Sequence, residues 1–224
     1  MIAFPEVQRR AQDELDTVVG RDRLPTFADT PRLPYACAVM KEVLRWRPAV
    51  PLGIPHAAIN DDWYEGMFIP KGTVCISNVW HCNHDRAVFG EDAEDFKPGR
   101  HLDEQGELLS GPAETNQTGH VTFGSGRRIC VGKELAADSL FINTTRMLWA
   151  ANFERARDEN GKELPVDLDT LVNTGVVMSV LILAEDSPSL MQYSFFQHTY
   201  SLRLRDHSPV PRGGVYSCRG TREL

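Results

Sequence analysis

Apolar residues recur every three or four positions in the first stretch of the chain, PEVQRRAQDELDTVVG. This spacing predicts a helix with one apolar face, because about 3.6 residues complete a helical turn. Pro5 suits the first turn, where no backbone donor is needed, and Gly20 suits the position just past the end. The predicted inward residues are Val7, Ala11, Leu15 and Val18.

Two later stretches show the same helical period. One is YACAVMKEVLRWR, which Pro48 ends because proline cannot continue a helix. Its predicted inward residues are Ala36, Val39, Met40, Val43 and Leu44. The other begins near Val131 and runs to about Trp149. Its predicted inward residues are Leu135, Ala136, Leu140 and Leu148.

Strand signals lie between the second and third predicted helices. The stretch WYEGMFIPKGTVCISNVW alternates in part and offers turns at Glu65-Gly66 and Lys71-Gly72, so two or three short antiparallel strands are predicted. Residues 83–118 are rich in Asp, Gly and Pro, and they predict a long irregular segment of the kind that often carries function. The stretch DENGKELP, residues 158–165, predicts a hairpin turn.

Together these elements indicate a mainly α fold with small antiparallel β-sheets, which is the α+β class. From residue 179 to residue 224, neither a helical nor a strand period lasts for long. We therefore divide the chain into a structured part, residues 1–178, and a divergent tail, residues 179–224. The tail is expected to be irregular, or to result from translation through an intron or in a shifted frame.

Composition and charge exclude some classes of protein. The 224 residues carry a formal net charge of -7, which argues against nucleic acid as a partner. The longest apolar run, residues 176–184, is too short to span a bilayer, and the start lacks the apolar core of a secretory signal. Five irregularly spaced cysteines then favour an intracellular setting without a disulfide framework.

The stretch VTFGSGRRICVGKELA, residues 121–136, places a lone thiol before the third predicted helix. The stretch does not match a phosphate-binding loop, which needs four residues between its glycines and a hydroxyl after its lysine. Here five residues separate Gly126 from Gly132, and no hydroxyl follows Lys133. A zinc or redox site fails because Cys130 has no C-x-x-C partner.

A second group of metal-ligand types occurs in WHCNHD. It contains His81, Cys82 and His84 within four positions. We interpret it as an ordinary turn that follows a strand.

The remaining possibility for Cys130 is a single thiolate ligand to haem iron. A helix that begins just after Cys130 supplies a positive dipole end and free backbone N–H groups, which stabilise a thiolate. Arg128 can pair with a haem propionate, and Phe123 can shield the sulfur from water. Room for a flat macrocycle near the backbone would come from Gly124, Gly126 and Gly132.

The sequence FGSGRRICVG resembles the haem-binding signature of the cytochrome P450 superfamily, F-x-x-G-x-R-x-C-x-G. The matching positions are Phe123, Gly126, Arg128, Cys130 and Gly132, and Ala136 also fits the pattern. The resemblance implies that Cys130 is the axial ligand of the iron in haem b and that Arg128 binds a propionate.

Further motifs appear in the order that this family has. KEVLR contains Glu42 and Arg45, similar to the E-x-x-R of the K helix. FKPGRHL resembles F-x-P-x-R-F, and Arg100 matches the arginine that completes a Glu-Arg-Arg ion triad. His101 replaces the final Phe, which we expect to weaken local packing rather than the triad. His56 stands where the family often contacts a second propionate.

The likeness covers residues 4–178 and the C-terminal half of a family member, closest to the fungal microsomal type, as judged from GRDRLPTF, LRWRPAVPLG and IPKGT. It implies a partial fold from about helix J through the cysteine ligand and helix L. The implied reaction inserts one oxygen atom of O2 into a small organic substrate, with electrons from an NADPH-dependent reductase that docks near Arg127 and Lys133. Full-length relatives of this type sit on the endoplasmic reticulum membrane, whereas this chain has no anchor.

The sequence lacks the A-G-x-D/E-T run of the family's oxygen-activating I helix. We therefore assign no catalytic residue to the chain and expect that it does not catalyse alone. The alternative to a monooxygenase is an inactive haem-binding fragment, or a truncated product without function.

Overall fold

The computed structural model of the chain describes residues 1–166, 168, 171–173, 178–180 and 200–205. These residues form a mainly helical fold with small antiparallel sheets, which confirms the predicted class. Most of the predicted tail, residues 179–224, lies outside the described residues.

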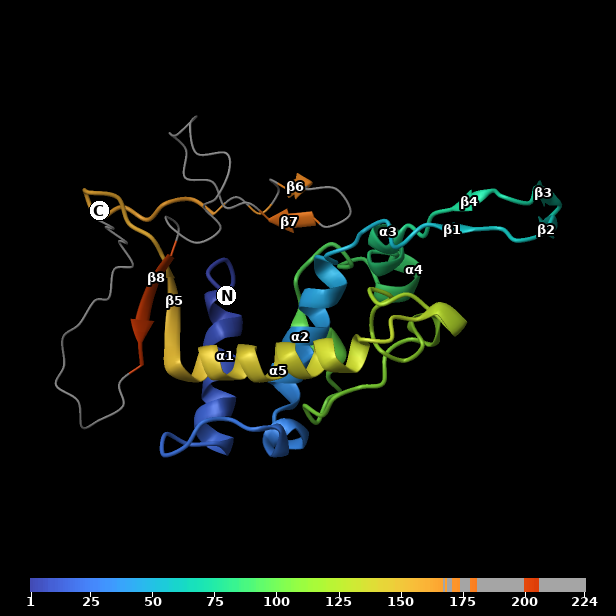
Figure 1. The fold of residues 1–224 in the computed structure, drawn as a ribbon. Coiled ribbons are helices and arrows are strands. Elements are labelled where there is room, and N and C mark those ends of the chain that lie inside the picture. The colour runs from blue at the N-terminus through green and yellow to red at the C-terminus, as the bar shows by residue number, and fades with distance from the viewer. Residues whose placement is uncertain (167, 169–170, 174–177, 181–199, 206–224) are drawn as a thin grey trace, which may run out of the picture.

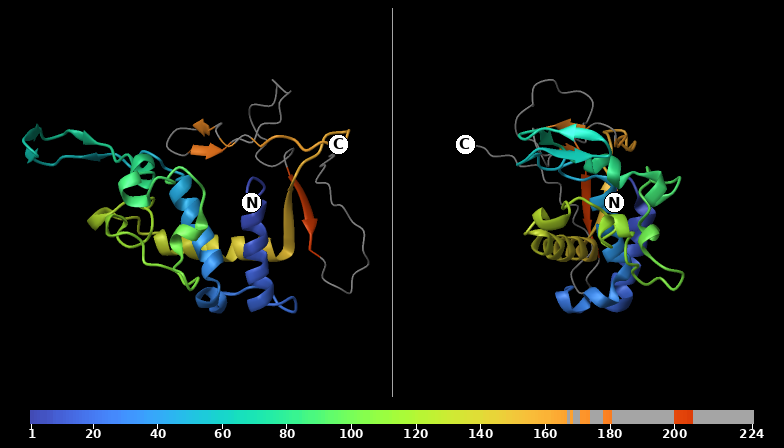
Figure 2. Two further views of the ribbon diagram at one scale, coloured as in Figure 1. Left: turned by 180° about the vertical axis from the view of Figure 1, so that it is seen from behind. Right: turned by 90° about the vertical axis from the view of Figure 1, so that its right-hand side faces the viewer.

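Three long helices form the centre of the fold: α1 (Pro5–Val18), α2 (Pro34–Trp46) and α5 (Lys133–Ala150). All three predictions of helix from apolar spacing are confirmed. Proline begins α1 and α2, where its missing N–H costs no hydrogen bond. Helix α5 crosses α1 and α2, as both Figure 1 and the reverse view in Figure 2 show.

The hydrophobic core lies where these three helices meet. The cluster of buried side chains contains Val7, Ala11, Leu15, Val19, Leu33, Tyr35, Ala36, Val39, Phe141, Leu148 and Trp149. Partly buried Val18 and Met40 pack against it. Most predicted inward residues of α1 and α2 therefore contribute to one core.

Two predicted inward residues face solvent instead. Val43 is 41% exposed because α2 buries Glu42 and Arg45. Leu135 is 73% exposed because the buried residues of α5 begin only at Phe141. Those two predictions are wrong, since apolar spacing reveals neither a buried ion pair nor which end of a helix is covered.

A ribbon of two antiparallel strand pairs extends away from the helices (Figure 1). At its base β1 (His56–Ala57) pairs with β4 (Val74–Cys75), and at its tip β2 (Asp62–Tyr64) pairs with β3 (Met67–Ile69). The tip turn uses Glu65 with φ 47° and Gly66 with φ 80°, the left-handed pair that a tight hairpin favours. The predicted turn is confirmed, and so is the prediction of two or three strands, because β2, β3 and β4 fall on the predicted stretch and β1 precedes it.

Short helices interrupt the segment that was predicted to be irregular. Among the described residues, the short helices are η1 (Phe27–Arg32), α3 (Val79–Asn83), α4 (Arg86–Phe89), η2 (Pro98–His101), η3 (Ala113–Thr115) and η4 (Gly126–Arg128). Asn78 and Asp85 cap α3 and α4, because their side chains accept hydrogen bonds from the amides of His81 and Ala87. Segment η2 packs against α2 and so carries the middle of the chain onto the helical core.

Beyond α5 the chain returns to strands. Strand β5 (Ala151–Arg155) pairs with β8 (Tyr200–Leu204), which lies inside the tail predicted to be irregular. Strand β6 (Leu171–Asn173) pairs with β7 (Met178–Val180). The predicted hairpin turn at residues 158–165 is confirmed, since the amide of Asp158 donates to the carbonyl oxygen of Lys162 over 2.9 Å.

Replacement of a core leucine should destabilise the fold much more than replacement of an exposed one. Leu15 is 0% exposed, so Leu15→Ala should lower the free energy of unfolding by about 2–5 kcal/mol. Leu135→Ala is the matched control, and its effect should stay within about 0.5 kcal/mol. Urea titration followed by circular dichroism measures both. Equal losses in the two variants would contradict the position of this core.

Candidate functional site

Residues 121–132 form the cysteine loop, which leads directly into α5. Gly124 with φ 73° and Gly126 with φ 62° adopt left-handed conformations, which explains why glycine stands at both positions. The amide of Cys130 donates to the carbonyl oxygen of Phe123 over 2.9 Å and closes the loop. The carbonyl oxygen of Cys130 accepts from the amide of Lys133 over 3.3 Å, which holds the cysteine at the start of the helix.

The space around the thiol is open. Cys130 is exposed, and a Cβ built on Gly132 would lie 3.9 Å from its Sγ. A Cβ built on Gly124 or Gly126 would meet no atom within 4 Å. The loop therefore borders open space that a flat group could occupy without a clash.

Charge and an aromatic ring lie next to the thiol in sequence. Arg127 and Arg128 are exposed, and neither takes part in an ion pair in the part of the chain that the structure describes. Phe123 is half-buried, with its ring centroid 5.6 Å from that of His120. An exposed thiol, an available guanidinium and an open loop fit the needs of haem, since a thiolate can bind iron and arginine can bind a propionate.

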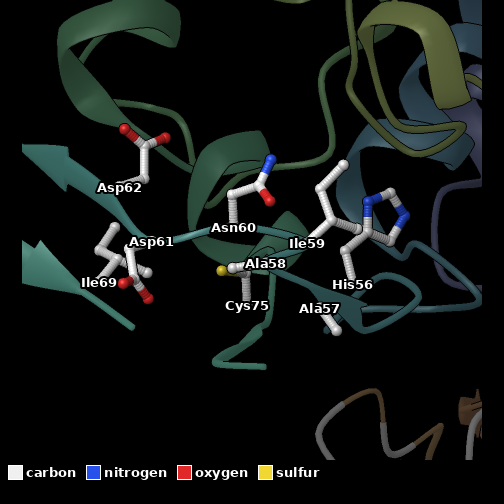
Figure 3. A pocket seen from close by; sticks show the side chains of 9 residues that line it. All are labelled: His56, Ala57, Ala58, Ile59, Asn60, Asp61, Asp62, Ile69 and Cys75. Atoms are coloured by element: carbon white, nitrogen blue, oxygen red, sulfur yellow. The ribbon is translucent and has the colours of Figure 1, made fainter. Parts of the chain in front are cut away.

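His56 lies apart from this loop, on the ribbon. It is exposed and stands opposite Cys75 across β1 and β4. Figure 3 shows it at one end of a hollow of about 380 Å³, with Asp62 at the other end. The residues that line this hollow all come from the ribbon. The structure therefore does not bring His56 into the cysteine loop, and its role toward a propionate stays a prediction.

The three residues of the predicted ion triad meet in the interior. Glu42 and Arg45 have fully buried side chains, and that of Arg100 is 9% exposed. Arg45 donates to both carboxylate oxygens of Glu42 at 2.8 Å, and Arg100 Nε donates to Oε1 at 3.0 Å. The spacing of Glu42 and Arg45 on one face of α2 allows the bidentate pair.

The remaining guanidinium donors are used as well. Arg45 Nη1 donates to the carbonyl oxygens of Asn83 and Ala93, both at 2.7 Å. Arg100 Nη1 donates to Asp92 Oδ1 at 3.0 Å, and Nη2 donates to the carbonyl oxygen of the same residue at 2.7 Å. Both arginines thereby bind backbone of the segment that follows α3, as well as Glu42.

His101 is a third side-chain partner of Glu42. Its side chain is 5% exposed, and its Nε2 lies 2.9 Å from Glu42 Oε2. Because a carboxylate only accepts, Nε2 is the donor. The expectation that His101 merely weakens packing is therefore wrong. The replacement of Phe by His in the motif could have indicated this contact, because an imidazole can donate a hydrogen bond to a carboxylate and a phenyl ring cannot.

These contacts keep Glu42 ionised. Burial alone would raise its pKa, but hydrogen bonds from Arg45, from His101 and from the amide of Lys97 outweigh that effect. The pKa of Glu42 is lowered from 4.5 to about 2. The network therefore stays charged across the physiological range.

His120 is a second buried imidazole near the loop. It is 7% exposed, and its Nδ1 accepts a hydrogen bond from the amide of Thr122 over 3.3 Å. Burial, and to a smaller extent the charges of His101 and Lys41, lower its pKa from 6.5 to about 4. The ring that contacts Phe123 is therefore neutral at pH 7.

The WHCNHD stretch forms α3 rather than a plain turn. His81 and Cys82 are exposed, while His84 is buried with its Nδ1 2.8 Å from the carbonyl oxygen of Trp80. The described residues contain no group of three or more His, Cys, Asp or Glu that could hold a metal ion. Asn83 of this stretch contacts the cysteine loop, since its side chain accepts a hydrogen bond from the amide of Val121, and no motif or spacing in the sequence selects it.

Comparison with known proteins identifies the family that carries this loop and this network. The chain matches the sequence profile described as Cytochrome P450 over residues 1–176. That match covers well over half of the chain, so the protein belongs to the cytochrome P450 family.

Its relatives among curated proteins are fungal cytochrome P450 monooxygenases. One from Armillaria gallica is 58% identical over 79% of this chain and 34% of its own length. Cytochrome P450 monooxygenase 58 of Postia placenta is 48% identical over 79% of this chain and 33% of its own length. Cytochrome P450 monooxygenase yanC of Aspergillus niger is 42% identical over 80% of this chain and 33% of its own length.

The chain thus spans about a third of the length of these relatives, a smaller share than the half that the order of motifs suggested. No helix among the described residues is long and apolar enough to cross a membrane.

Loss of the Glu42 charge should destabilise the protein strongly. Glu42→Gln leaves buried Arg45 without its counter-charge, which should cost about 3–5 kcal/mol in free energy of unfolding. Glu134→Gln is the control, because that carboxylate is 80% exposed and pairs with Lys133 at 3.3 Å. Urea unfolding at pH 7 distinguishes the two. A Glu42→Gln protein as stable as the control would contradict the importance of this pair.

The pH dependence of stability should carry the signature of His120. As pH falls below 6.5, the unfolded chain binds a proton at this ring, whereas the folded chain does so only near pH 4. The free energy of unfolding should therefore fall across this window, by about 3 kcal/mol in all from this group. Urea unfolding at pH 7 and pH 4.5 should show a smaller loss for His120→Gln than for the unmodified chain. Identical losses would show that His120 does not stay neutral in the fold.

Proposed function

We propose that this chain is the haem-binding part of a haem-thiolate monooxygenase, with Cys130 as the axial ligand of the iron in haem b. The observation that carries the proposal is the cysteine loop: its backbone is closed by the Phe123–Cys130 hydrogen bond, and its thiol is exposed at the start of α5. The matching segments correspond to about helix J through helix L of the family, and α2 takes the place of the K helix. Residues 1–178 then form the C-terminal part of the cytochrome P450 domain, followed by a divergent tail, residues 179–224.

Different residues of the chain would bind different parts of the cofactor. The Cys130 thiolate would bind iron, and the exposed Arg128 guanidinium would bind one propionate. His56 is assigned to the other propionate, supported by its position after α2 in the sequence and by its exposure. Gly126 and Gly132 would leave room for the macrocycle, and Phe123 would shield the sulfur from water. Glu42, Arg45 and Arg100 form an ion network that is linked to the loop through Asn83.

When bound, a cysteine-ligated haem supplies the reductive activation of O2, one atom of which is inserted into a small organic substrate while the other is reduced to water. Electrons would come from an NADPH-dependent reductase. Arg127 and Lys133 flank the cysteine and offer positive charge to an acidic partner surface. The full-length protein would act at the endoplasmic reticulum membrane. The formal net charge of -7 supports a function without nucleic acid as a partner.

A second candidate function is haem binding without catalysis. The sequence contains no A-G-x-D/E-T run, and the Cys130 thiol is exposed rather than enclosed. We assign no catalytic residue to this chain. In this alternative, haem is held by the same residues but oxygen is not activated, or the truncated product binds nothing.

The carbon monoxide spectrum of the reduced, haem-reconstituted chain tests the proposal. Thiolate ligation should give a strongly red-shifted Soret band, which Cys130→Ala should abolish. Cys82→Ala is the matched control, because that thiol is also exposed, and it should keep the band. Absence of the band from the unmodified chain, or its survival in Cys130→Ala, would refute the assignment. Substrate turnover with a reductase then separates the monooxygenase from the inactive haem binder.

A further inference from the structure

The residue that joins the ion network to the cysteine loop is Asn83, at the end of α3. Its side chain is completely buried. Its carbonyl oxygen accepts a hydrogen bond from Arg45 Nη1 over 2.7 Å. The same residue therefore contacts the triad through its backbone and leaves its side-chain amide for a different partner.

That amide binds the first two residues of the cysteine loop. Asn83 Oδ1 accepts from the amide of Val121 over 2.8 Å, and Nδ2 donates to Thr122 Oγ1 over 3.1 Å. Thr122 Oγ1 donates in turn to the carbonyl oxygen of Leu44 on α2, over 2.6 Å. Both ends of the amide are thus used, and the hydroxyl it contacts is tied to the helix that carries Glu42.

The position of these contacts matters because they hold the two residues directly before Phe123. Phe123 follows Thr122 directly, and its carbonyl oxygen receives the amide of Cys130. A shift of residues 121 and 122 would therefore move the acceptor that fixes the cysteine. A buried amide with both ends paired has one orientation, since a flipped amide would leave a donor facing the Val121 N–H.

We propose that Asn83 is a positioning residue that fixes the start of the cysteine loop against the Glu42–Arg45 network, so that Cys130 presents one thiolate geometry to haem iron. The proposal rests on the haem-thiolate function above. Asn83 does not touch the iron ligand. It acts through Val121 and Thr122, and the ligand class concerned is a Cys-bound iron porphyrin.

Amide hydrogen exchange of the full chain without haem tests the contact itself. Asn83→Ala should raise the exchange rate of peptides covering residues 121–130 at least tenfold, because Val121 loses its acceptor and the loop loses its anchor. Thr145→Val is the matched control: it removes another buried hydrogen bond, from Thr145 Oγ1 to the carbonyl oxygen of Phe141 at 2.7 Å, away from the loop. The control should leave exchange in residues 121–130 unchanged.

The carbon monoxide spectrum of the reconstituted chain tests the effect on ligation. Among molecules that bind haem, the fraction with the thiolate-type band should fall several-fold in Asn83→Ala and should stay at the original level in Thr145→Val. Asn83→Asp should be intermediate, because it keeps the acceptor for Val121 and loses the donor to Thr122. An Asn83→Ala protein with the original thiolate fraction and the original loop exchange would overturn the proposal.

A second pair of variants tests the same link from the loop side if Asn83→Ala does not fold. Thr122→Val removes the hydroxyl that Asn83 contacts, whereas Thr122→Ser keeps it. The valine variant should lose thiolate fraction and the serine variant should retain it, and equal behaviour would overturn the proposal. Failure of the proposed function is separate, because then the unmodified chain itself would show no thiolate band.

Discussion

The buried carboxylate of Glu42 is the group on which the rest of the described structure depends. Removing a charge from water costs several kcal/mol unless partners surround it, and here Arg45, Arg100 and His101 all do so. The two arginines also bind carbonyl oxygens between α3 and η2. One charge on α2 thereby helps to fix a long segment that contains only short helices.

Polar contacts add to hydrophobic packing in this part of the molecule. The three long helices meet around aliphatic and aromatic side chains, so α1 is secured by burial of apolar area. The segment after α3 has only short helices, and it contacts α2 through η2, through the guanidinium groups and through the Phe96 ring, whose centroid lies 5.3 Å from that of Trp46. Such a network depends on every partner, because a charge left buried and unpaired costs more than the pair contributes.

Sequence patterns predicted where the helices and strands lie better than they predicted which side chains of each helix are buried. The helical period located α1, α2 and α5, and the Glu65-Gly66 pair located the tip of the ribbon. Period alone could not show that α2 buries charged residues in place of Val43, because a buried ion pair looks like a solvated one in sequence. It also missed Asn83, whose role depends on residues 38 positions away that only the fold brings near.

The candidate site also has features that local sequence predicts and features that only the fold determines. The motif selects Cys130 and the left-handed glycines because those choices are local: a thiol, a turn and a helix start. The direction of the thiol, by contrast, depends on contacts with residues far away in the sequence. The loop contains a single short 3-10 turn, so its position follows from its anchors, which are α5 at one end and the contacts of Asn83 and Thr122 at the other. These anchors lead back to α2, so a distant E-x-x-R pair constrains the geometry of the cysteine.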